Sequence, residues 1–381
     1  MKILCNDIGT GTQDIYLFNS HQQIENGYKL VLPSPTMMIH RKLKIASRDQ
    51  LSVYLSGVTM GGGPSHWGAE EIIRNGGKVY ASPDAARTFN DDLEKVAADG
   101  IIVVSEDEGY RLPADILRVD MRDFDFSAIQ NAFNLFGVSL TDLDAVAVAV
   151  FDHGAAPVDI SDRKFRFDYL DERIRQENRL SAFAYLSNDI PTSMTRLLSV
   201  ADSARGVNVP LVVMDTAPAA VLGALYDPQV SRLDRKIIAN VGNFHTLAFR
   251  LGHGGIEGCF EHHTGLIDMT KLDVTLKQLA DGSLTNQEVF DDHGHGALIY
   301  SHDQYEIPEV PFGVVVTGPR RSMMLESSLH PYFPAPFGDM MLAGCFGLLS
   351  AVGDVFPAWK GEIEDSMNDR KKITIAPWDV E

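Results

Sequence analysis

The sequence is poor in cysteine and has no apolar run long enough to cross a bilayer. Its cysteines, Cys5, Cys259 and Cys345, are far apart and form no short pair, so we expect reduced, buried thiols. The longest apolar run, residues 340–352, is shorter than a membrane-spanning helix, and no apolar segment of signal-peptide length precedes Asp7, the first acidic residue. These absences predict a cytoplasmic protein that does not enter membranes.

Basic residues are also scarce relative to acidic ones. The chain has 33 Lys and Arg against 52 Asp and Glu, a formal net charge of -19. A surface of this sign repels nucleic acid and anionic membrane, so neither is an expected partner. An anionic ligand therefore has to be held locally, by backbone amides, a metal ion or a few cationic side chains.

The chain is long enough for two or more domains, with 381 residues of which 45% are hydrophobic. Strand-like and helical stretches alternate in its first half, which predicts the α/β class. We expect strands at residues 3–8, 15–19, 29–33, 52–58 and 145–151, and helices at residues 64–75, 83–98, 126–136 and 192–204. A second block begins near Lys236 with a pattern that predicts a hairpin, and it ends near Phe337.

Two segments carry small residues four positions apart. They are residues 217–226 and residues 339–353, the second with Gly347 in its stripe. Such stripes let helix backbones approach closely. We expect residues 339–353 to form one continuous helix packed across residues 217–226, although ordinary core packing is an alternative explanation of the pattern.

The segment NDIGTGTQDIYLFN, residues 6–19, predicts two strands joined by a tight turn. A buried strand brings Asp7 to its carboxyl end, and Gly9, Thr10, Gly11 and Thr12 form the turn. Inward-facing turn amides and hydroxyls suit phosphate groups. Asp7 would face a Mg²⁺ ion through water, since Mg²⁺ favours oxygen ligands and keeps its waters. A plain hairpin with a glycine turn is the alternative.

A similar pattern recurs at IANVGNFHTLAFRL, residues 238–251. Gly242, Asn243 and Thr246 lie at its bend. Later, FGVVVTGPRRSMM predicts a buried strand that leads through Gly318 to a helix start. Arg320, just beyond, would stack on a base or pair with phosphate, or else lie in solvent.

In order, these segments resemble the actin-like ATPase superfamily of actin, sugar kinases and heat-shock chaperone ATPases: phosphate hairpin, connecting helix, second hairpin, adenosine turn and second connecting helix. The resemblance covers residues 6–352. It implies a two-domain actin-like ATPase (ribonuclease H-like) fold of the α/β class with Mg-ATP in an interdomain cleft. The expected divisions are residues 1–226, residues 227–338 and a returning helix and tail, residues 339–381.

More narrowly, GVTMGGGP, FDHGAAP, VGNFHTLAF, FEHHTG, DDHGHGA and PFGDMMLAGCFGLL resemble a prokaryotic family labelled as a pyruvate formate-lyase activating enzyme. Glycyl-radical activation uses a clustered Cys-x-x-x-Cys-x-x-Cys motif to hold a [4Fe-4S] centre, and the three dispersed cysteines form no such motif. Radical chemistry is therefore not expected, whereas an activating role driven by ATP is.

The sequence departs from the superfamily at three positions of the site. Asn240 stands where many members carry a metal-facing Asp, Ala217 stands where chaperone ATPases carry Glu, and Gly318 alone remains of the usual glycine pair. Fast hydrolysis is therefore not expected.

Four carboxylates are candidates for catalytic work near the terminal phosphate. Asp7 is one, and Asp14, Asp152 or Asp215 would orient water or accept a substrate proton. Asp152 follows an apolar strand at the end where α/β sites tend to lie. A structural cap is its alternative role.

Histidines gather after the second hairpin. His262, His263, His293 and His295 lie in turn-rich segments with nearby acidic residues, and we expect them close together at the cleft rim. Imidazoles with carboxylates can hold a transition metal, and hydrogen-bonded roles without metal are the alternative. The triple-glycine loop after residue 60 leads into Pro64 and predicts either an anion site at a helix start or a loop with unusual backbone angles.

Taken together, the sequence predicts an ATP-dependent activase or kinase-like enzyme that works through domain closure on a small-molecule substrate or protein client. One alternative is a metal-dependent hydrolase or lyase that uses the histidines. The other is a sensor that binds nucleotide or a metabolite without catalysis.

Overall fold

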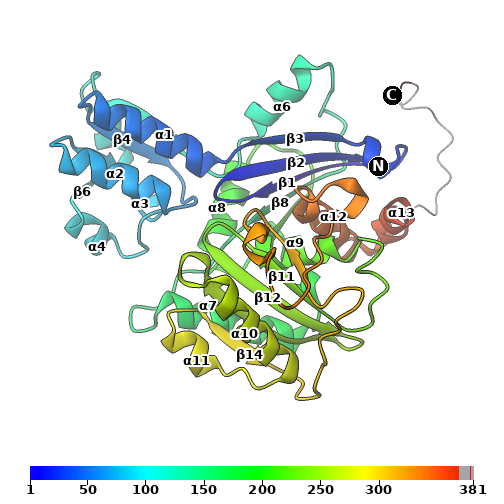
Figure 1. Cartoon of the computed structure of the whole chain (residues 1–381). Helices are drawn as coiled ribbons and strands as arrows, with labels where there is room; N and C mark the ends of the chain where they lie inside the picture. The colour runs from blue at the N-terminus through cyan, green and yellow to red at the C-terminus, as the bar shows by residue number, and fades with distance from the viewer. Residues whose placement is uncertain (369–377, 379–381) are drawn as a thin grey trace.

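The computed structural model describes residues 1–368 and 378 and contains two mixed sheets (Figure 1). The first sheet has the strand order β3-β2-β1-β8-β10-β9. Its strands are β1 (Lys2–Ile8), β2 (Thr12–Asn19), β3 (Tyr28–Pro33), β8 (Ala145–Val150), β9 (Ala184–Leu186) and β10 (Leu211–Asp215). The first three strands are antiparallel, and β8 runs parallel to both β1 and β10.

The second sheet has the order β14-β13-β12-β11-β15. Its strands are β11 (Lys236–Val241), β12 (His245–Gly252), β13 (Gly255–His263), β14 (Gly296–Ile299) and β15 (Val315–Thr317). As in the first sheet, the first three strands form an antiparallel meander. The first of them, β11, also pairs in parallel with a later strand, β15. This repeated ribonuclease H-like order confirms the predicted two-domain actin-like fold.

Helices cover both faces of the first sheet, which explains why β8, with the sequence AVAVAV, is buried along its whole length. One face packs against α12 (Ala343–Val355) and α13 (Pro357–Met367). The other packs against α6 (Phe126–Leu135), α7 (Asp162–Gln176) and α8 (Thr195–Ser203). α9 (Thr216–Ala224) follows β10 and packs against α12.

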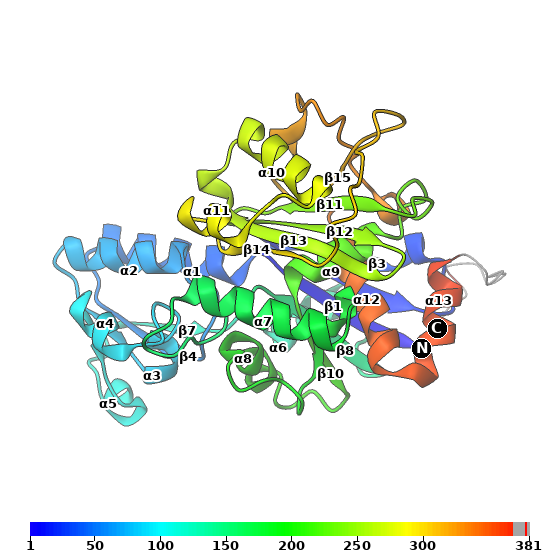
Figure 2. The same cartoon turned by 90° about the horizontal axis from the view of Figure 1, so that it is seen from below.

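The second sheet lies above the first in Figure 2, with α7 against β14 on the side that faces the first sheet. α10 (Met269–Asp281) covers its outer face through an apolar core of its own. α11 (Asn286–Asp291) leads from α10 into β14. The cleft between the two sheets is therefore bordered by strand ends from both.

A lobe inserted between β3 and β8 extends to the left in Figure 1. Its parallel sheet has the order β6-β5-β4-β7 and its own apolar core. Its elements are α1 (Pro35–Arg48), β4 (Val53–Gly57), α2 (Pro64–Arg74), β5 (Val79–Ala81), α3 (Pro83–Ala86), α4 (Leu93–Ala98), β6 (Ile101–Val103), α5 (Glu106–Tyr110) and β7 (Leu117–Met121). The division of the chain after residues 226 and 338 stays a proposal.

The five predicted strands, both hairpins and three of the four first-half helices are confirmed. The predicted helix over residues 83–98 is wrong, because Asn90 accepts from the amide of Asp92 and forms a turn, and Asp92 then caps a new helix. The helix expected over residues 339–353 begins only at Ala343, since Asp339 accepts from the amide of Met341 in a turn. The helix expected after Gly318 is a short 3₁₀ turn.

The cysteines are free and buried, as expected. In the described part of the chain, no helix is both long enough and apolar enough to span a bilayer.

Candidate functional site

A cavity of about 130 Å³ lies between the two mixed sheets, where the carboxyl ends of β1, β11 and β15 meet. The turn after β1 contributes residues 9–12, and the turn after β11 contributes residues 242–245. The first residues of α9 and α12 complete its wall. Because helix N-termini carry partial positive charge, this wall suits an anionic ligand.

The two turns have the same hydrogen-bond pattern. The amide of Gly9 donates to the carbonyl of Thr12 at 2.9 Å, and the amide of Gly242 donates to the carbonyl of His245 at 3.0 Å. The turns also nearly touch, since a Cβ atom on Gly11 would lie 2.9 Å from the Asn243 side-chain nitrogen. One cavity is thus bordered by equivalent turns from both sheets.

Two acidic side chains, Asp7 and Asp14, lie opposite each other on β1 and β2 beside this cavity. Thr216 donates to Asp7 at 2.6 Å. Burial raises the pKa of Asp7 to about 6 against the lowering effect of that bond. Burial, and then the charge of Asp7, raise the pKa of Asp14 to about 8. Within the described residues no basic side chain pairs with either, so the two carboxyls suit a cation.

Gly344 allows α12 to begin directly against this pair. A Cβ atom there would overlap a carboxyl oxygen of Asp7. Glycine at this position therefore brings the helix N-terminus to the floor of the cavity.

The other two candidate carboxylates have their oxygens engaged. Asp152 accepts from the amides of Gly154 and Leu197, both at 2.8 Å, as in its alternative role as a cap. Asp215 caps α9 and forms a buried ion pair with Arg166. Burial raises the pKa of Asp215, and Arg166 opposes that rise. In this conformation Asp152 holds two backbone amides, and Asp215 holds the start of α9 and the charge of Arg166. Their catalytic roles stay a prediction.

The remaining predicted ligand residues are spread around the second turn. Gly318 lines the cavity with a φ of +98°, which favours glycine. Thr246 is buried, and its hydroxyl lies 2.9 Å from that of Thr264. Arg320 is exposed beyond the turn, and its backbone amide donates to Val241.

A wider groove of about 810 Å³ adjoins the cavity. It is lined by the triple-glycine loop, residues 87–95 and the loop after β8. The groove and the cavity share Thr10, Phe151, Arg196, Phe244 and His245 as walls. Arg196 pairs with Asp123 at 2.7 Å and donates to the carbonyl of Phe151, which places a guanidinium at the junction.

Only two of the four predicted histidines enter one cluster. His263 and His295 have ring centroids 4.6 Å apart. His262 instead lies 3.1 Å from Asp292, and His293 is exposed at a positive φ of 66°. The third member is His245, which sequence analysis did not single out, because its closeness to His263 comes from strand pairing and not from spacing.

The family model described as "Putative pyruvate format-lyase activating enzyme (DUF1786)" matches residues 60–323, more than half of the chain. The chain belongs to this family. The matched DUF1786 region includes the triple-glycine loop, the second hairpin and Gly318. A search of curated proteins finds no match.

The cysteines of this DUF1786 member do not fit an iron–sulfur cluster. Cys5 and Cys345 lie in the core between the first sheet and α12, whereas Cys259 lies in the core between the two mixed sheets. All three are buried, and burial raises the pKa of each thiol. Cluster ligation requires gathered thiolates, so these residues offer no site for that group.

Among solved structures, this DUF1786 chain is similar to the activator of the 2-hydroxyisocaproyl-CoA dehydratase from Clostridium difficile with bound ADPNP (9% identity, 99% of each chain covered, TM-score 0.34). It is also similar to the ethanolamine utilization protein EutJ from Carboxydothermus hydrogenoformans (11% identity, 91% of this chain and 89% of that chain, TM-score 0.31). These similarities are weak, and the fold follows from the strand order of the two sheets.

Proposed function

We propose that the chain binds Mg²⁺-ATP in the cavity between the two sheets and acts, through domain closure, as an ATP-dependent activase or kinase-like enzyme. The observation that carries this proposal is the pair of equivalent turns, at residues 9–12 and 242–245, on one cavity. The amides of Gly9 and Gly242 close their own turns, which leaves the other turn amides, such as that of Gly11, to donate to phosphate oxygens. Glycine at these positions lets the ligand approach the backbone closely, because no side chain intervenes. A ligand held by both turns would draw the two domains together.

Asp7 and Asp14 would hold the Mg²⁺ ion. Their opposed, buried carboxyls provide hard oxygen ligands, and bound Mg²⁺ would supply charge neutralisation to the phosphates. On a chain of net charge -19, free ATP should bind poorly, so the affinity should depend on the metal.

The groove beyond Phe151 and Arg196 is where a small-molecule substrate or a segment of a client protein would meet the terminal phosphate. It adjoins the cavity and is several times larger. Arg196 at the junction would stabilise charge on a transferring phosphoryl group once closure released it from Asp123.

A sensor that binds ATP without rapid turnover is the second candidate. Its support is that Asp152 and Asp215 both have their oxygens engaged, which leaves neither free to activate a nucleophile. Phosphate release distinguishes the two candidates, because the sensor would bind Mg²⁺-ATP and release no phosphate.

The test is thermal unfolding with ATP, ADP or GTP, with and without Mg²⁺. A ligand at 100 times its Kd stabilises the folded state by about 2.7 kcal/mol, which this assay resolves. Asp7→Asn should abolish the Mg²⁺-dependent part of the shift. The matched control is Asp189→Asn, at an exposed turn, which should behave as wild type.

Wild-type protein without any Mg²⁺-dependent shift at millimolar nucleotide would remove the nucleotide assignment. An equal shift in Asp7→Asn and wild type would remove only the role of Asp7.

A further inference from the structure

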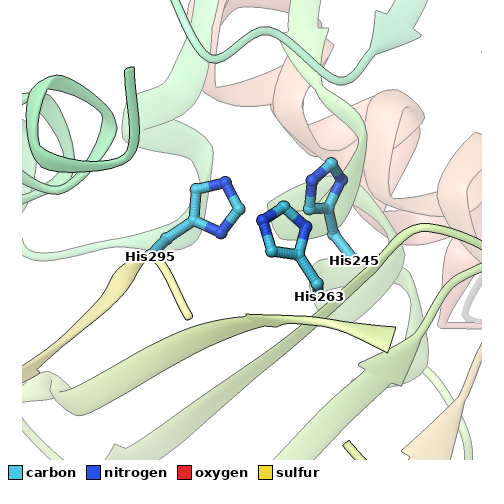
Figure 3. Close-up of side chains that lie close together, drawn as sticks. All are labelled: His245, His263 and His295. Carbon is cyan, nitrogen blue, oxygen red and sulfur yellow. The ribbon is translucent and has the colours of Figure 1, made fainter. Parts of the chain in front are cut away.

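His245, His263 and His295 form a compact cluster in which the three rings lie close together (Figure 3). Each offers a ring nitrogen, and these nitrogens lie within 4.8 Å of one another. Ring centroids are 4.6 to 5.2 Å apart. Among the residues that the structure describes, only histidines belong to this group, so it is an all-imidazole donor set.

Strand pairing builds the cluster. His245 begins β12 and lies directly opposite His263 at the end of β13. His295 immediately precedes β14, and its amide donates to the carbonyl of Glu261 on β13. Three neighbouring strands therefore place these side chains together. His262 lies one residue away, and because successive strand residues face opposite sides, it pairs elsewhere.

The cluster contains buried polar atoms without ordinary partners. Nδ1 of His295 and Oε1 of Glu261 lie 3.5 Å apart, and in the described part of the chain neither makes a hydrogen bond of good geometry. The side chain of His295 is 6% exposed and that of Glu261 is fully buried. A histidine that bound a metal through Nε2 would donate its Nδ1 proton to this carboxylate, the usual arrangement around metal-bound imidazole.

The charges behind the cluster are also unbalanced. Arg166 is fully buried and pairs with two carboxyl groups, Asp215 and Glu261. One guanidinium thus faces two acids, and burial of unpaired charge is costly. A cation held by the neighbouring imidazoles would balance the second acid.

We propose that His245, His263 and His295 bind one divalent transition-metal ion of borderline softness, of the Zn²⁺ or Fe²⁺ class. Three nitrogens on tetrahedral Zn²⁺, with bonds of about 2.0 to 2.1 Å, lie roughly 3.4 Å apart. The ring nitrogens now lie within 4.8 Å of one another, so the ion would draw them closer together. Mg²⁺ does not suit the site, because it prefers oxygen ligands.

The metal would face the groove through an open fourth position. His245 forms part of the groove wall, and His245 and His263 are both partly exposed. Three protein ligands plus one exchangeable position are typical of catalytic rather than structural zinc sites. The ion would therefore polarise a ligand in the groove.

The experiment uses the full-length chain without a histidine tag, stripped with a chelator. Calorimetric titration with ZnCl₂ should give one equivalent. CoCl₂ should produce the intense visible bands of four-coordinate Co²⁺. His263→Gln and His245→Gln should each weaken Zn²⁺ binding by more than the roughly 10- to 100-fold cost of losing an outer-shell partner. Thermal unfolding identifies any variant that does not fold.

His293→Asn is the matched control, because His293 is exposed, lies two residues from His295 and has a positive φ that asparagine tolerates. It should bind Zn²⁺ as wild type does. The proposed site would be overturned if folded His263→Gln and His245→Gln bound Zn²⁺ with wild-type affinity. Loss of Zn²⁺ binding in His293→Asn would also overturn it. The readout needs no nucleotide, so it stands apart from the ATP test.

Discussion

At the scale of single residues, the facing carboxyls Asp7 and Asp14 dominate the electrostatics of the cavity. Both pKa values are raised from 3.8, to about 6 and about 8. Between the unfolded and folded pKa values, the folded protein binds more protons than the unfolded chain. The contribution of these groups to stability is therefore present at acidic pH and is lost as pH rises through the folded values.

Asp14→Asn should remove the larger part of this pH dependence. We expect the metal-free variant to be more stable than wild type at about pH 8.5 and closer to it at about pH 5, measured by urea unfolding. Mg²⁺ should stabilise the wild type at the higher pH and have less effect on the variant. Parallel pH profiles for the two proteins would contradict the assignment of this pair.

Sequence reasoning found the residues whose position is set locally. Asp7 and the turn at residues 9–12 follow from one strand end and its glycines. The strand partners were harder to predict, because the pairing of Asp14 with Asp7 and of His245 with His263 depends on register between strands. The engagement of Asp152 and Asp215 also depends on distant groups, an amide of α8 and Arg166 on α7.

At the scale of elements, the crossing of α9 and α12 is the closest helix contact of the site. Cβ atoms on Gly223 and Gly347 would overlap the carbonyl oxygens of Ala343 and Ala219. The two helices connect the sheets to the cavity floor. We therefore propose this crossing as the hinge of the domain closure.

Gly347→Ala should destabilise the protein by about 1 to 3 kcal/mol, the usual cost of overpacking. Gly361→Ala on α13 is the control, since nothing lies within 4 Å of its added methyl group. Alanine is the better helix former, so this control should be neutral or stabilising by up to about 1 kcal/mol. Urea unfolding measures the stability of both variants. A Gly347→Ala variant as stable as the Gly361→Ala control would contradict the tight crossing of α9 and α12.

Element prediction worked best where the apolar pattern was regular. The buried strands and the small-residue stripe were recognised, although α12 starts later because Asp339 forms a turn. α7 was missed, since its sequence DRKFRFDYLDERIRQ is mostly charged and its buried face includes Arg166. The lobe strands β5 and β6 have only three residues each, too few for a pattern.

At the scale of the whole molecule, the ligand cavity belongs to both sheets. Mg²⁺-ATP should therefore slow amide hydrogen exchange at residues 9–12 and residues 242–245 together, because each turn would contact the same phosphate chain. Mass spectrometry of exchanged peptides measures both turns at once. Protection of one turn alone would mean that the nucleotide does not bridge the domains.

The near-contact of Gly11 with Asn243 has a kinetic consequence. The cavity, at about 130 Å³, is well below the roughly 300 to 1,000 Å³ of typical ligand pockets. If a nucleotide binds in this cavity as proposed, the turns at residues 9–12 and 242–245 would have to move apart to admit it. At high concentration, the rate of capture would stop rising and would equal the rate of opening. The speed of response would thus be an intrinsic property of the hinge, independent of how much nucleotide surrounds the protein.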